Sequence, residues 1–208
     1  MRLAISVVLM VTPLWGTSSV AQDDSAKVTV SKEALTAEQV AVYRVVLKNY
    51  LKGSNGTLNL SNTTYPLDLG GPLFDEGCVK GVKLEKSDES HQVVHLFESA
   101  LPLAPNVTLV DPKQQSVKVK QNDPQDLLKK AIDEHQTVTD KQLGTSVQLA
   151  FSTGLFSFSE IVFGQGHRDA VLSYSFVCGI LCGHGNTLRL ERAGYTWKIR
   201  KTCGSWIS

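Results

Sequence analysis

The feature that most constrains the fold is a change in hydrophobic periodicity at Gly154. Beyond this residue, apolar and polar residues alternate in short runs that glycine-rich turns separate. Alternation of this kind predicts strands with one buried side and one solvent-facing side. The runs predict a four-stranded antiparallel meander over residues 154–208. Pairing Arg192 with Tyr195 across its last turn sets Leu190 beside Trp197 on the apolar face.

The apolar spacing before this point is helical. Thr36-Ala-Glu-Gln39 matches a capping box, and apolar residues recur behind it at helical intervals until Gly53. Asp123 and Pro124 predict the start of a second helix, and Asp140 the cap of a third. Helices followed by strands predict an α+β fold, with N-terminal helices packed on a C-terminal four-stranded antiparallel meander.

The N-terminus has the pattern of a secretory signal peptide. Arg2 precedes an apolar run from Leu3 to Leu14, and Ser19-Val20-Ala21 supplies small residues for cleavage after Ala21. The apolar run is shorter than the roughly 20 residues that a membrane-spanning helix needs. We therefore predict a signal peptide at 1–21 and a single secreted or periplasmic α+β domain at 22–208, with no membrane span.

The charge of the chain argues against a nucleic-acid partner. The formal net charge is +1, and it falls to zero once the segment that carries Arg2 is removed. Bulk binding to nucleic acid or to an anionic membrane requires an excess of basic residues. We expect no nucleic-acid partner, and the sequence identifies no other partner.

Four cysteines in an exported chain predict two disulfides. They are Cys78, Cys178, Cys182 and Cys203. Two pairings stay open. In the first, Cys178 joins Cys182 and Cys78 joins Cys203. In the second, Cys182 joins Cys203 and Cys78 joins Cys178.

The stretch CGILCGHG at 178–185 concentrates two cysteines and a histidine, which are potentially reactive or metal-binding, in eight residues. The first interpretation is a tight turn between strands, closed by a disulfide. The alternative is a copper(I) or redox site of Cys178, Cys182 and His184, because thiolate and imidazole ligands suit soft metals. A thioredoxin-like pair has two residues between its cysteines at a helix N-terminus, whereas three residues intervene here. We expect no cofactor.

Three further groups of residues are candidate sites. His91 and His95 stand four apart, with Glu98 on the same face if residues 88–101 are helical, but Gln92 replaces the general base of a zinc protease. His167-Arg-Asp169 lies at a predicted turn. A basic cluster on the last hairpin is either a solvated sheet face, which we favour, or an anion-binding surface; its residues are Arg189, Arg192, Lys198, Arg200 and Lys201.

Three C-terminal stretches carry a succession of motifs, from a Ser-x-x-x-Phe strand through a cysteine-glycine turn and a Gly-x-Trp-Lys hairpin to a terminal Trp-hydrophobic-Ser: TGLFSFSEIVF, AVLSYSFVCGILCGHGNTLRLERAGYTWKI and the closing WIS. Together they resemble a family of exported bacterial proteins of unknown function, over residues 154–208. VYRVVLKNYL at 42–51 is more loosely similar to that family's first helix. Arg192 and His184 depart from the family's pattern. The resemblance implies export and no assigned activity, so no catalytic residue is transferred.

The sequence therefore predicts a non-enzymatic, disulfide-stabilised domain that binds a ligand or partner or serves the cell envelope. No nucleophile elbow, P-loop or dinucleotide fingerprint is present, and no catalytic residue is assigned. The alternatives are a thiol or metal protein and a small-molecule binder. The binder has a pocket between helices and sheet that Tyr174, Phe176 and Trp197 line.

Overall fold

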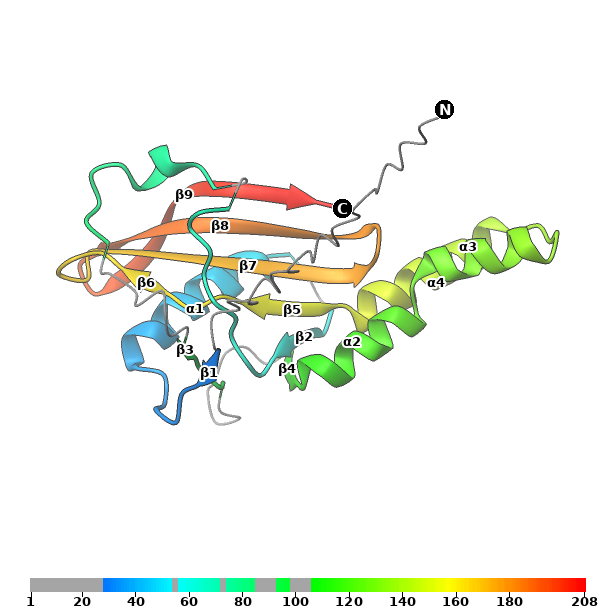
Figure 1. The fold of residues 1–208 in the computed structure, drawn as a ribbon, viewed down its shortest axis with the longest axis horizontal. Coiled ribbons are helices and arrows are strands. Elements are labelled where there is room, and N and C mark those ends of the chain that lie inside the picture. Colours follow the sequence, from blue (N-terminus) through cyan, green and yellow to red (C-terminus); the bar gives the residue numbers. More distant parts are fainter. Residues whose placement is uncertain (1–27, 54–55, 72–73, 85–92, 98–105) are drawn as a thin grey trace, which may run out of the picture.

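The computed structural model describes residues 28–53, 56–71, 74–84, 93–97 and 106–208. The predicted signal peptide at 1–21 lies outside these residues. The structure is built on a seven-stranded mixed sheet of order β4-β2-β5-β7-β8-β9, with β6 paired to β7 off this path (Figure 1). The strands are β2 (Leu58–Ser61), β4 (Val107–Val110), β5 (Leu155–Phe158), β6 (Val162–Phe163), β7 (Asp169–Gly179), β8 (Cys182–Ala193) and β9 (Thr196–Ile207).

The predicted fold of helices on a four-stranded antiparallel meander is wrong. β5, β7, β8 and β9 are antiparallel neighbours, but β2 continues the sheet beyond β5 through parallel pairing, and β4 pairs parallel with β2. Parallel neighbours require a crossover connection, and here three helices carry the chain from β4 to β5. The alternation within a strand shows which side is buried, but it does not identify a distant strand as the neighbour.

The predicted register of the last hairpin is also wrong, by two residues. Gly194 and Tyr195 form the turn, and Gly194 has the positive φ of 64° that such two-residue turns require. Leu190 therefore lies opposite Ile199 instead of Trp197. Tyr195, which the predicted register pairs with Arg192, is fully exposed at the tip.

Helix α1 (Ala37–Tyr50) covers one face of the sheet. The predicted capping box is confirmed: the Thr36 hydroxyl accepts from the Gln39 N–H at 3.2 Å, and the Thr36 N–H donates to the Gln39 side chain at 2.8 Å. The buried side of the helix joins the main core, and the Tyr43 hydroxyl donates to the Ser159 carbonyl at 2.9 Å. Burial of this hydroxyl raises the pKa of Tyr43, with Glu160 as a second cause.

Helices α2 (Pro112–Gln121), α3 (Pro124–Asp133) and α4 (Asp140–Thr153) form the crossover. The predicted cap of α3 by Asp123 is confirmed, whereas Thr139, one residue before the predicted Asp140, caps α4. Helix α2, which Asp111 caps and Pro112 begins, was not predicted from the sequence. In Figure 1, α3 and α4 run side by side and project past the end of the sheet. The expectation that the helices pack on the sheet face is wrong for α3, which packs on α4, whereas α2 contacts β5 and β7 and α4 contacts β7.

The remaining elements are short. β1 (Thr29–Val30) and β3 (Val93–Val94) form a separate two-stranded parallel sheet, and η1 (Glu76–Val79) is a 3₁₀ turn. Val93 and Val94 were expected in a helix over 88–101, whose other residues lie largely outside the described part of the chain. At η1, the Asp75 N–H donates to the Cys203 carbonyl at 2.6 Å, which places Cys78 beside β9.

Candidate functional site

The four cysteines form two pairs at disulfide distance. Cys78 joins Cys203, 125 residues apart, and Cys178 joins Cys182, four residues apart. This is the first of the two pairings that the sequence left open. On a chain-entropy estimate, the long link stabilises the fold by about 5 kcal/mol and the short link by about 2 kcal/mol. The first disulfide thus carries most of the covalent stabilisation, and the second serves the local shape of one turn.

The Cys178–Cys182 link closes the turn between β7 and β8. Gly179 lies opposite Cys182 in the ladder, so Ile180 and Leu181 form the tip of the hairpin. These two side chains are 70% and 68% exposed, which is unusual for large aliphatic residues. Cys178 itself is buried, whereas Cys182 is partly exposed. The turn therefore presents an apolar tip on a fixed base.

Asp123 connects this turn to the projecting helices. Its carboxylate accepts from the Gln125 N–H at 3.0 Å as the cap of α3, and from the Ile180 N–H at 2.7 Å in the turn. Only 6% of Asp123 is exposed, and both carboxylate oxygens are used. A Cβ at Gly179 would lie 2.9 Å from this carboxylate, so the close approach requires glycine. Asp123 thereby fixes the start of α3 against the turn.

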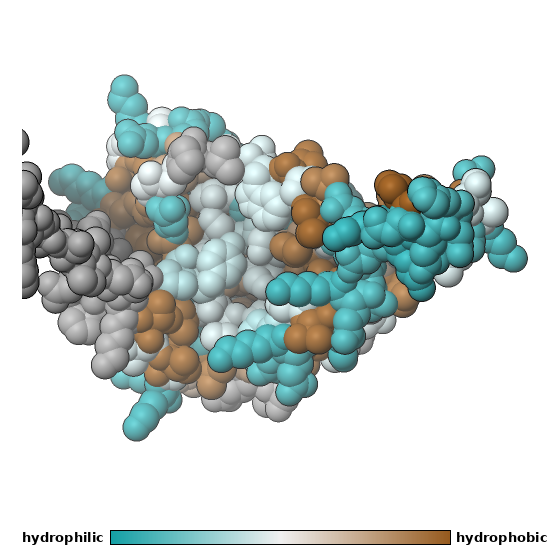
Figure 2. Space-filling model, turned by 45° about the vertical axis from the view of Figure 1, so that its right-hand side comes forward, coloured by the Kyte–Doolittle hydropathy of each residue, from teal (hydrophilic) through white to brown (hydrophobic). Residues whose placement is uncertain are grey.

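A cleft of about 580 Å³ opens between α3, α4 and this turn, and we call it the disulfide cleft. Figure 2 shows apolar side chains gathered at the base of the projecting helices, beside their mostly polar end. The cleft combines aliphatic and aromatic walls with a few polar groups. Its lining residues are Asp123, Pro124, Gln125, Leu128, Val147, Phe151, Cys178, Leu181, Cys182, Gly183, His184, Ile207 and Ser208.

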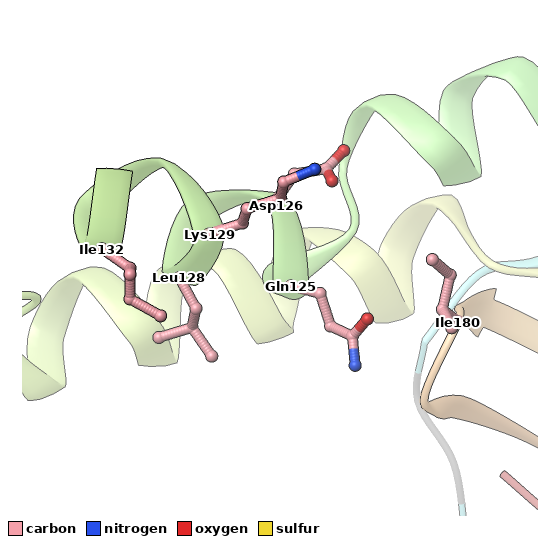
Figure 3. Close-up of a pocket in the computed structure, with 6 residues that line it drawn as sticks. All are labelled: Gln125, Asp126, Leu128, Lys129, Ile132 and Ile180. Carbon is pink, nitrogen blue, oxygen red and sulfur yellow. The ribbon is translucent and has the colours of Figure 1, made fainter. Parts of the chain in front are cut away.

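An open hollow of about 490 Å³ adjoins the disulfide cleft along α3. Figure 3 shows Leu128 and Ile132 projecting from one side of α3, with Ile180 reaching in from the β7–β8 turn. Ile132 is 73% and Leu128 40% exposed, because this side of α3 projects beyond the sheet, whereas Ala131 is buried. The apolar surface thus continues from the disulfide cleft onto α3.

His184 lines the disulfide cleft and also contacts aromatic side chains of the core. Its ring stacks on Tyr50 of α1 with ring centroids 5.8 Å apart, and lies 5.6 Å from the ring of Phe176. Burial lowers the pKa of His184, because the charged imidazolium is poorly solvated there. Burial also raises the pKa of Tyr50 to about 12, with Tyr174 as a second cause. The polar edge of the cleft at His184 is therefore uncharged at neutral pH.

The predicted metal alternative used Cys178, Cys182 and His184. In this structure both sulfurs are joined to each other, so neither is a thiolate ligand. Among the described residues, no group of three or more His, Cys, Asp or Glu side chains is arranged to hold a metal ion. A soft-metal site at these three residues therefore remains a prediction for the reduced chain alone.

The predicted aromatic pocket is filled by core packing. Phe176 and Trp197 are 5% and 6% exposed. Tyr174 stacks on Phe156 with ring centroids 5.3 Å apart. The disulfide cleft lies at the end of the sheet and is lined by other side chains than the three that were predicted.

The basic cluster on the last hairpin is largely paired with acidic residues. Arg189 contacts Asp169 at 2.8 Å and also donates to the Cys78 carbonyl at 3.0 Å. The remaining described pairs are Arg192 with Glu38, Lys201 with Asp75, and Arg200 with Glu191. Because acidic residues of the same chain neutralise these basic side chains, the cluster is better explained as a solvated sheet face than as an anion-binding surface.

His167 and His95 each contact a glutamate that the sequence did not connect to them. The His167 Nδ1 lies 2.5 Å from Glu38, which links the predicted His-Arg-Asp turn to α1. The His95 Nδ1 lies 3.0 Å from Glu160, which also accepts the hydroxyl of Thr64. His91 and Glu98, the predicted companions of His95, lie outside the described residues. Both contacts join distant segments. Their residues line neither the disulfide cleft nor the open hollow along α3.

The residues that shape the disulfide cleft were not predictable as a site from the sequence. Asp123 was recognised as a helix cap, but its second contact, to a backbone N–H 57 residues away, leaves no local pattern. Phe151 of α4 is 55% exposed and stacks on Phe176, a contact between distant segments. The sequence did contain one indication of this site: Ile180 and Leu181 are two aliphatic residues inside a glycine-rich turn, where polar residues are usual.

Within the described part of the chain, no helix is long and apolar enough to cross a membrane. Comparisons with protein-family models, with curated proteins and with solved structures found no match to this chain.

Proposed function

We propose that this chain is an exported, non-enzymatic binding domain, and that the disulfide cleft holds a small apolar ligand. Two disulfides support an oxidising compartment, since such links persist outside the cytoplasm. The signal-peptide pattern at 1–21 and the resemblance of residues 154–208 to exported bacterial proteins agree with that location. We infer a secreted or periplasmic protein cleaved after Ala21.

The observation that carries the proposal is the combination of size and lining in the disulfide cleft. Its volume of about 580 Å³ lies within the range of small-molecule sites, about 300–1,000 Å³. Leu128, Phe151 and Leu181 supply apolar walls, while Gln125 and His184 supply polar groups able to orient a ligand. The described lining contains no lysine or arginine, and both oxygens of the Asp123 carboxylate accept hydrogen bonds within the chain, so we expect the part of the ligand that enters to be uncharged.

A second candidate function is docking of a protein partner. The apolar surface extends outside the disulfide cleft, where Ile132 and Ile180 are 73% and 70% exposed. Extended apolar patches of this kind mark protein-protein interfaces. We rank this second because the disulfide cleft is already shaped without a partner, whereas polar side chains lie among the apolar ones on the surface around it (Figure 2).

The test is a fluorescence titration with N-phenyl-1-naphthylamine, an uncharged apolar dye that brightens when it leaves water. The mature chain is compared with Leu181→Asp and Leu128→Asp, which place a carboxylate in the disulfide cleft. Tyr195→Asp is the matched control, because it introduces the same charge at a fully exposed site on the opposite hairpin end.

We expect saturable binding of one dye molecule, weakened at least about tenfold by either cleft variant because a carboxylate is costly to desolvate. Tyr195→Asp leaves the affinity unchanged. Absent or non-saturable binding, or equal weakening by all three variants, overturns the proposal. If Ile132→Asp weakens the dye affinity as much as Leu181→Asp does, the ligand lies on the wider surface, and protein docking becomes the better assignment.

A further inference from the structure

The two disulfides differ in how a thiol reaches them. Cys78 and Cys203 are 1% and 0% exposed, and their backbone carbonyls accept hydrogen bonds from the Arg189 guanidinium and the Asp75 N–H. Cys178 is equally buried, but its partner Cys182 is partly exposed, and both line the disulfide cleft. Exchange with an external thiol requires access to one sulfur of the bond. Only the Cys178–Cys182 link meets this condition among the two disulfides of the chain.

The β7–β8 turn has supports other than its disulfide. The Asp123 carboxylate accepts from the Ile180 N–H at 2.7 Å. The Ser208 N–H donates to the Gly183 carbonyl at 3.0 Å, and Val177 lies opposite Gly183 in the ladder. These contacts hold the hairpin when the covalent link opens. Both the oxidised and the reduced chain are therefore folded, as a reversible redox site requires.

The surroundings of Cys182 suit a protein as the thiol donor. Ile180 and Leu181 project beside it and are largely exposed, so they provide an apolar contact for an approaching partner. The buried position of Cys178 directs attack toward the other sulfur. The attacking group therefore enters along the disulfide cleft and meets Cys182 first.

From this geometry we infer that Cys178–Cys182 is an exchangeable disulfide that a protein dithiol of the thioredoxin class reduces through Cys182. A thiolate of the partner attacks Sγ of Cys182 and forms a mixed disulfide, while the Cys178–Cys182 bond breaks and Cys178 leaves as a thiolate that takes up a proton. The second partner thiolate attacks its own first sulfur, breaks the mixed disulfide and releases Cys182. Two electrons pass from the partner, which becomes oxidised, to this chain. The exchange requires no ligand in the disulfide cleft, so a failure of the proposed binding function would not affect this inference.

The experiment uses the oxidised mature chain with two reductants, dithiothreitol and a thioredoxin whose second cysteine is replaced by serine. Free thiols are alkylated at each dithiothreitol concentration and assigned by peptide mass spectrometry, while circular dichroism follows the fold. The thioredoxin variant cannot resolve a mixed disulfide, so it marks the sulfur that it attacks.

We expect Cys178 and Cys182 to be labelled at dithiothreitol concentrations at least about tenfold below those that label Cys78 and Cys203, with unchanged circular dichroism. We expect the thioredoxin variant to be trapped as a mixed disulfide with Cys182. Leu181→Ser slows its capture without changing reduction by dithiothreitol, whereas Tyr195→Ser changes neither. Simultaneous labelling of all four cysteines, labelling only upon loss of the fold, or capture on Cys178 would each overturn the inference.

Discussion

The carboxylate of Asp123 accepts a hydrogen bond from the backbone N–H of Ile180 at 2.7 Å, across 57 residues of sequence. The same carboxylate caps α3 through Gln125. The Asp123 side chain therefore sets the distance between the projecting helices and the β7–β8 turn. Because these two elements form opposite walls of the disulfide cleft, the cleft depends on this contact for its shape.

Asp123→Asn is expected to destabilise the chain by about 1–3 kcal/mol, measured by urea denaturation. The amide retains one acceptor oxygen for the Gln125 N–H, but its NH₂ group then faces the Ile180 N–H, and a buried donor is left unpaired. Asp111→Asn is the matched control: Asp111 caps α2 through the Gln114 N–H alone and has no contact to the turn. A loss in the control as large as that at Asp123 would mean that capping alone explains the effect.

Gly179→Ala is expected to disturb the same contact from the other side. The added Cβ would lie 2.9 Å from the Asp123 carboxylate, closer than a carbon-oxygen contact allows. The carboxylate must move, so the variant loses stability by about 1–3 kcal/mol and becomes insensitive to a further Asp123→Asn change. Additive losses in the double variant, measured by the same denaturation assay, would show that the two positions do not interact.

Removing each disulfide separately is expected to give unequal losses. Replacing Cys78 and Cys203 by serine lowers the free energy of unfolding by about 5 kcal/mol, whereas replacing Cys178 and Cys182 lowers it by about 2 kcal/mol. The difference follows from sequence separations of 125 and 4 residues. Thermal unfolding followed by circular dichroism measures both. If the short link proved the more stabilising, the assignment of the long link as the main covalent support would fail.

His184 is expected to make the folded chain less stable in acid. Burial lowers its pKa below the unfolded value of 6.5, so below pH 6.5 the unfolded chain binds the proton more readily than the folded chain. This contribution to stability is present above pH 6.5 and is lost as the pH falls. His184→Phe, which retains a ring against Tyr50, is expected to lose less stability between pH 7.5 and pH 5 in urea denaturation. An unchanged pH dependence would show that His184 titrates alike in both states.

Local patterns in the sequence predicted the elements with strong caps. Thr36-Gln39 and Asp123-Pro124 define helix starts because a few adjacent atoms satisfy each other. The parallel pairing of β2 with β4 and β5 was not predictable in this way, since it depends on how a three-helix crossover returns the chain. The same limit applies to the site: the cysteine turn was recognised, but its contact with Asp123 is long-range.

The single measurement that tests the account most directly is an NMR titration of the mature chain with N-phenyl-1-naphthylamine. If the disulfide cleft is the binding site, the amide signals of Leu128, Phe151 and Leu181 shift together and saturate, while that of Tyr195 stays in place. Shifts that spare these three residues and gather elsewhere, for example at the exposed Val30 and Val93 of the small sheet, would contradict the proposed function.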